Sequence, residues 1–123
     1  MAIIAIDFDG TIVTHDYPRI GSPIHLAIST IKDLIINGHK IILWTMRSDQ
    51  TLDDAVKYLG DNGIILFGIN RNPDQNWSTS PKAYAQVYID DAALGCPLIH
   101  SNFDRPQVNW TLVRKHLRSM GLL

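Results

Sequence analysis

The chain has 123 residues, a net charge of −1 with neutral histidines, 46% hydrophobic residues and 19% charged residues. This length suits one domain around one hydrophobic core, so we expect a single domain over residues 1–123, and the composition excludes a largely disordered chain. The balanced charge also gives the protein no general attraction to nucleic acid or to anionic membranes.

The first third of the chain predicts a strand, a helix and a second strand. Residues 2–8 form a nearly continuous apolar and β-branched run, the pattern of a strand that is buried on both faces. Ser22 and Pro23 predict the start of a helix, as its cap and first residue. Apolar residues then recur at helical spacing as far as Asn37-Gly38, which predicts the end of that helix. Residues 40–44 predict the second buried strand.

The remaining elements alternate in the same way. The patterns predict a helix over 48–62, a third strand over 64–67, a long polar loop over 68–81, a short helical segment carrying Lys82, a fourth strand over 86–89, a short fifth strand over 97–100 and a last helix from about Trp110 to Met120. Alternating strands and helices predict a doubly wound (Rossmann-like), mostly parallel α/β sheet with right-handed crossovers.

Polar residues stand where the predicted strands end. Because the carboxyl ends of parallel strands meet at one edge of the sheet, we expect these side chains to converge there. They are Asp7 and Asp9, Thr45, and Asp90 and Asp91, with Lys82 shortly before the fourth strand. Carboxylates without a cluster of histidines or cysteines suit Mg²⁺, and a cation would also relieve the repulsion between neighbouring aspartates.

These residues carry a resemblance to a known family. The motif D-x-D-G-T after a hydrophobic strand, a second strand ending in Thr45, then Lys82 and a strand ending in D-D resemble the four motifs of the haloacid dehalogenase-like (HAD) hydrolase superfamily. The resemblance covers nearly the whole chain. It implies a HAD-like fold, for which we expect the strand order 3-2-1-4-5.

The resemblance also implies roles for individual residues. Asp7 would be the nucleophile that forms an aspartyl-phosphate, and Asp9 would be the general acid and base. The phosphate group would be bound by Gly10, Thr45, Arg47 and Lys82. Magnesium would be held by Asp7, by Asp9 through its main-chain carbonyl, and by Asp90 and Asp91, one of them directly and the other directly or through a water molecule; which of the two binds directly stays open. The second aspartate of the first motif resembles the phosphatase branch of the superfamily, so the implied reaction is magnesium-dependent hydrolysis of a phosphomonoester.

Two residues near this site keep alternative interpretations. Arg47, in a T-x-R sequence after the second strand, would either reach the substrate phosphate or be a solvated residue at a helix start. His15 would be a surface residue or would touch the substrate. Away from the site, Arg114, Lys115 and Arg118 cluster near the C-terminus, either as a local basic face or as a solvated helix face, and we favour the solvated face.

No segment is long enough for the cap domain that covers the site in many members of this superfamily. We therefore expect an open, capless site, covered by the 68–80 loop with Trp77, in its own chain or from a neighbouring subunit of a homo-oligomer. A small phosphorylated molecule is the expected substrate. A nucleic-acid end or a phosphoprotein stays open.

Two other classes of protein compete with this interpretation. A phospho-receiver domain is also a magnesium-binding α/β protein, but it has its acceptor aspartate after the third strand, where this chain has Phe67-Gly68-Ile69. A catalytically silent binding module is the second alternative. A silent site has no need of Asp7, Asp9, Lys82 and Asp90 together.

The cysteine content and the N-terminal apolar run predict the cellular setting of the protein. The single cysteine, Cys96, excludes an internal disulfide and a multi-cysteine metal site. The apolar run at the N-terminus lacks a preceding basic segment and is interrupted by Asp7, so it predicts neither a signal peptide nor a membrane span. We expect a soluble, cytoplasmic protein with no membrane partner.

Overall fold

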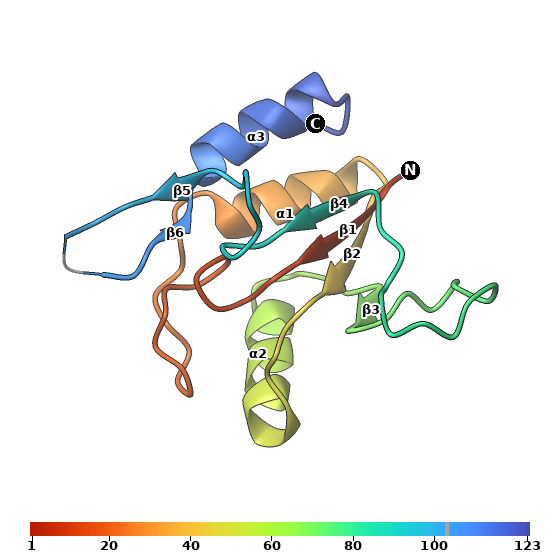
Figure 1. The fold of residues 1–123 in the computed structure, drawn as a ribbon, viewed down its shortest axis with the longest axis horizontal. Helices are drawn as coiled ribbons and strands as arrows, with labels where there is room; N and C mark the ends of the chain where they lie inside the picture. Colours follow the sequence, from red (N-terminus) through yellow and green to blue (C-terminus); the bar gives the residue numbers. More distant parts are fainter. Residues whose placement is uncertain (103) are drawn as a thin grey trace.

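The computed structural model describes residues 1–102 and 104–123. In chain order its elements are β1 (Ile3–Ile6), α1 (Ala27–Ile36), β2 (Lys40–Leu43), α2 (Asp49–Asp61), β3 (Gly68–Ile69), β4 (Val87–Ile89), β5 (Leu98–Ile99), β6 (Gln107–Val108) and α3 (Trp110–Ser119). Figure 1 shows α1 and α3 side by side, with α2 on its own at the other end of the view. None of the helices described is both long and apolar enough to cross a membrane.

The main sheet has four parallel strands in the order β3-β2-β1-β4, so β1 lies in its interior. Ile3 of β1 pairs with Lys40 of β2, and Ile6 pairs with Leu43 on one side and with Ile89 of β4 on the other. All four residues of β1 are buried, as the apolar run predicts. The mostly parallel α/β sheet expected from the sequence is therefore present.

The predicted fifth strand does not join this sheet. β5 pairs antiparallel with β6 in a separate two-stranded ribbon, which corrects the last position of the expected order 3-2-1-4-5. Two successive turns follow β4, in which Ala93 donates to the carbonyl of Asp90 and Cys96 donates to the carbonyl of Ala93. The chain therefore leaves β4 before Leu98, whose strand partner is Val108.

The first helix begins later than Ser22 and Pro23 predict. The backbone around these residues pairs with the segment after β1: Thr14 donates to the carbonyl of Ser22, and Ile24 donates to the carbonyl of Ile12. This extended pairing prevents a helical turn, and α1 starts only at Ala27. Its end, capped by Asn37, agrees with the sequence.

The third strand and the segment around Lys82 also differ from expectation. The pairing with β2 begins only where Phe67 donates to the carbonyl of Ile41, so β3 is Gly68–Ile69 rather than 64–67. Lys82 lies in a local turn, since its N–H donates to Ser80 Oγ at 3.2 Å, and no helix forms there.

The two faces of the sheet are covered differently. Ile4 and Ile6 point into a large core shared with residues of all three helices described, whereas Ile3 and Ala5 point the other way. The buried cluster on that second face contains Ala83, from the connection between β3 and β4, and no helical residue. The expected double winding therefore has an irregular segment, 70–86, in place of a helix on one face.

Candidate functional site

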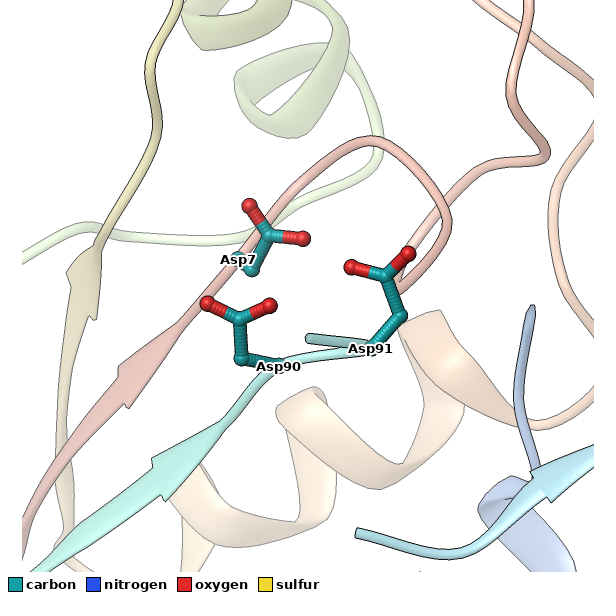
Figure 2. A group of neighbouring side chains, drawn as sticks. All are labelled: Asp7, Asp90 and Asp91. Atoms are coloured by element: carbon teal, nitrogen blue, oxygen red, sulfur yellow. The ribbon is translucent and has the colours of Figure 1, made fainter. Parts of the chain in front are cut away.

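Three aspartates converge at the carboxyl edge of the sheet, as the sequence predicts. Asp7 follows β1 and donates its N–H to the carbonyl of Ile89, so it lies beside the end of β4, where Asp90 and Asp91 follow. One carboxylate oxygen from each aspartate lies within 4.8 Å of the other two (Figure 2). The pairing of two neighbouring strands thus brings together residues that are more than 80 positions apart.

Thr11 connects the two halves of this cluster. Its Oγ1 donates to Asp7 Oδ2 at 2.9 Å and accepts from the N–H of Asp91 at 3.2 Å. Its own carbonyl accepts from Trp110 Nε1 at 2.6 Å, so α3 holds the turn after β1 in position. Thr11 is fully buried, and its bonds fix the relative position of the two carboxylates.

The electrostatics of the cluster are unfavourable for three bare carboxylates. Burial, and then the negative charge of Asp90, raise the pKa of Asp7 to about 8. Burial also raises the pKa of Asp90. Carboxylates crowded in a desolvated site resist ionisation and stay protonated unless a cation neutralises their charge. The donor set, three carboxylates with no thiol and no imidazole among the grouped ligand atoms, fits a hard divalent cation such as Mg²⁺.

His15 contacts the cluster from the loop after β1. Its Nε2 lies 2.8 Å from Asp91 Oδ2, and both side chains are 16% exposed. This pair lies directly over Gly10, where a Cβ atom would overlap both His15 and Asp91. Gly10 also has φ of +80°, a backbone conformation that other residues rarely adopt. Gly10 is therefore required by close packing, and its expected role in phosphate binding stays a prediction.

Asp9 does not belong to the group of ligand atoms but pairs with Arg47. Arg47 Nε donates to Asp9 Oδ2 and Nη2 donates to Asp9 Oδ1, both at 2.8 Å. The other three N–H groups of the guanidinium donate to the carbonyls of Pro18, Arg19 and Thr51. The hydrogen bonds to Asp9 raise the pKa of Arg47. Asp9 as a main-chain metal ligand stays a prediction.

This geometry corrects both interpretations of Arg47. The side chain is 1% exposed, so it is not a solvated residue at a helix start. All five of its N–H donors are engaged, so none is left for a phosphate oxygen in this arrangement. Arg47 instead orients Asp9 and fastens the loop around Pro18 to the first turn of α2.

Two hollows open onto the carboxylates. The larger, of about 510 Å³, is lined by Asp7, Asp9, His15, Tyr17, Thr45, Met46, Arg47, Asp90, Asp91, Ala92 and Arg105. The smaller, of about 370 Å³, is lined by Asp7, Trp44, Thr45, Met46, Asn70, Pro81 and Asp90. Thr45 lines both and is held by its N–H, which donates to Asn70 Oδ1 at 2.8 Å. The structure thus brings Thr45 to the carboxylates as predicted.

Lys82 and Trp77 lie elsewhere. Both line a separate hollow of about 420 Å³ together with Tyr84. The turn at Ser80 directs Pro81, and not Lys82, into the hollow beside Asp7. Trp77 packs edge-on against Tyr84 at 5.4 Å between ring centres. Within one chain, therefore, Lys82 does not join the carboxylates and Trp77 does not cover them.

Sequence reasoning missed part of this arrangement. Thr11 belongs to the D-x-D-G-T motif. The motif could have pointed to its position in the site, but no role was assigned to Thr11 from the sequence. The contact of His15 with Asp91 depends on a loop conformation that the sequence does not specify. Arg105 carried no signal, because it lies in an irregular segment between two short strands that belong to neither a motif nor a periodic pattern.

Fold and site together define a mostly parallel α/β protein with a carboxylate cluster at the carboxyl edge of its sheet. No family model and no curated protein matches the chain. Among solved structures, a conserved protein from Bacteroides thetaiotaomicron is 33% identical with a TM-score of 0.80, over 97% of this chain and 91% of that one. The two proteins belong to one family at this identity and coverage, and the description of that relative gives no activity.

Proposed function

We propose that this protein is a magnesium-dependent phosphatase of the HAD-like type, which hydrolyses a phosphomonoester through an aspartyl-phosphate on Asp7. The observation that carries the proposal is the convergence of Asp7, Asp90 and Asp91, with their carboxylate oxygens within 4.8 Å. Thr45 lines the same two hollows as Asp7 and adds a hydroxyl for a phosphoryl oxygen. The ordered motifs of the sequence point to the same chemistry.

The metal would be held by Asp7, Asp90 and Asp91. When bound, Mg²⁺ supplies positive charge that keeps the carboxylates ionised and polarises a phosphoryl oxygen of the substrate. The raised pKa of Asp7, about 8 without a cation, supports this requirement, because a protonated carboxyl group is not a nucleophile at neutral pH.

The reaction divides between the two aspartates of the first motif. An oxygen of the ionised Asp7 attacks phosphorus, the bond from phosphorus to the leaving oxygen breaks, and Asp9 gives that oxygen a proton. Asp9 then takes a proton from a water molecule, whose oxygen attacks the phosphorus of the aspartyl-phosphate. Inorganic phosphate leaves and the carboxylate of Asp7 is restored. Arg47 donates to both oxygens of the ionised Asp9 and so orients that side chain.

A small phosphorylated molecule is the substrate class that fits best. The larger hollow of about 510 Å³ is of the size that a small ligand occupies. A receiver-type function is less well supported, because the residue after β3 is Asn70 and no carboxylate stands there. A silent binding module has no specific observation in its favour.

The test is hydrolysis of an aryl phosphate by the purified protein. We expect turnover with Mg²⁺, loss of turnover with a chelator, and loss in Asp7→Asn, which keeps the shape of the side chain. Asp53→Asn, at an exposed position of α2, is the matched control and should retain full activity. Turnover that persists in chelator, or in folded Asp7→Asn, would remove the basis of the proposal.

A further inference from the structure

The larger hollow at the carboxylates has an imbalance of charge that concerns substrate binding. Four aspartates and two arginines line it, and Arg47 is fully engaged by Asp9 and three carbonyls. With all four aspartates ionised and Arg47 charged, the lining apart from Arg105 carries three negative charges. A divalent cation reduces this excess to one negative charge, which still repels a phosphate dianion.

Arg105 is the residue that can cancel the remaining charge. It lines the same hollow, is exposed, and makes no hydrogen bond or ion pair with residues 1–102 or 104–123. Lys82, which the motif pattern assigns to the phosphate, lines another hollow. Among the described residues that line the larger hollow, Arg105 is thus the cation with unused donors.

We propose that Arg105 is a substrate-binding residue, whose guanidinium pairs with the anionic phosphate of the phosphomonoester held at the carboxylates. The proposal deepens the proposed function and rests on it. A guanidinium offers two parallel N–H donors that match two phosphate oxygens, which an ammonium group does not. Arg105 comes from the segment between β5 and β6, so the small ribbon that leaves the main sheet would supply the positive charge for the substrate.

The first experiment measures binding without turnover. Inorganic phosphate is titrated into wild-type protein, Arg105→Ala, Arg105→Lys and the control Arg118→Ala, all with saturating Mg²⁺. Arg118 is an exposed arginine of α3 that lines neither hollow at the carboxylates. We expect phosphate affinity to fall about 10- to 100-fold in Arg105→Ala, the effect of losing a hydrogen bond to a charged group, with partial recovery in Arg105→Lys. Arg118→Ala should bind as the wild type does.

Magnesium titration distinguishes binding from damage to the site. Removing a positive charge beside a cation site should leave Mg²⁺ affinity unchanged or increase it. Arg105→Ala that binds phosphate as tightly as the wild type overturns the proposal. So does a variant that loses magnesium and phosphate affinity together, with no recovery in Arg105→Lys.

A kinetic comparison identifies which anion Arg105 meets. An unsubstituted aryl phosphate and one with a carboxylate on its ring are compared in wild type and Arg105→Ala. An equal rise of KM for both esters supports contact with the ester phosphate. A rise confined to the carboxylated ester overturns that contact and assigns Arg105 to a second anion on the leaving group. If wild-type protein binds phosphate through Arg105 but hydrolyses neither ester, the proposed function fails while the anion site stands.

Discussion

Asp7 has a pKa of about 8 in place of its ordinary 3.8, because it is buried beside Asp90. The folded state therefore binds this proton more tightly than the unfolded state does. The resulting stability is complete below the ordinary pKa and is lost as the pH rises through the raised one. A cation that occupies the cluster replaces the proton, so metal and proton compete for the same carboxylates.

We expect the melting temperature of the metal-free protein to fall between pH 5 and pH 9, and Mg²⁺ to restore more of it at pH 9 than at pH 5. Calorimetry in chelator and in Mg²⁺ measures both effects. Asp7→Asn, which cannot ionise, should show a flatter pH dependence. An identical pH dependence in wild type and Asp7→Asn would contradict the assignment of the raised pKa to Asp7.

Arg47 is a buried charge whose partners come from three segments of the chain. Arg47→Ala leaves Asp9 and three carbonyls without their donor, so we expect a loss of about 3 kcal/mol or more in the free energy of unfolding. Urea unfolding measures the loss. Arg19→Ala is the control, because its ion pair with Asp16 is exposed and contributes little. Equal stability of the two variants would show that the Arg47 pair is not buried in solution.

The sequence predicted the position of a functional residue where that residue directly follows a strand. Asp7, Asp90 and Asp91 end strands that pair with each other, so their convergence was predictable. The surroundings of Arg47 were not, because its partners Pro18 and Arg19 belong to a loop 28 or more positions away. A hydrogen bond across such a distance leaves no trace in periodicity or spacing.

Among the elements, the connection between β3 and β4 departs most from the expected pattern. It covers one face of the sheet without a helix, and Asn72 holds it by donating to the carbonyl of Tyr84 at 2.9 Å. Ala83 is 2% exposed and packs in the cluster with Ile3 and Ala5. The segment therefore covers this face of the sheet, as helices cover the other face.

Placing a charge in this contact should unfold the domain or weaken it severely. Ala83→Asp buries a carboxylate among apolar side chains, and we expect the free energy of unfolding to fall by about 3 kcal/mol or more. The loss should be smaller at low pH, where the introduced carboxyl group is protonated. Thr79→Asp, in the exposed part of the same segment, should change stability little. Unfolding curves of the two variants that coincide would contradict the packing of 70–86 on the sheet.

The elements that the sequence predicted well are those that are long or strongly periodic. α2 and α3 begin within a residue of their expected starts, and β1 and β2 follow their apolar runs. Among the two-residue strands, β3 was misplaced, β5 was predicted at its position but in the wrong sheet, and β6 was not predicted, because two residues carry no period and only their pairing partners define them. β3 is set by its register with β2, and β5 by its pairing with β6.

For the whole molecule, the geometry places a cluster of carboxylates, Thr45 and Arg105 around hollows formed within one chain. Trp77 is 63% exposed and lines neither of these hollows. We expect Trp77→Ala to hydrolyse an aryl phosphate with the kcat/KM of the wild type. The specific activity should not depend on protein concentration. A tenfold loss, or activity that rises with concentration, would instead mean that a neighbouring subunit's loop completes the site.

The most direct measurement is to look for the covalent intermediate on Asp7. Protein mixed with an aryl phosphate and Mg²⁺ is quenched in acid within one turnover, digested and analysed by mass spectrometry. We predict the mass of one phosphoryl group on the peptide that contains Asp7, absent in chelator and absent in Asp7→Asn. Turnover without this adduct, or the adduct on another residue, would contradict a phosphatase mechanism that proceeds through Asp7.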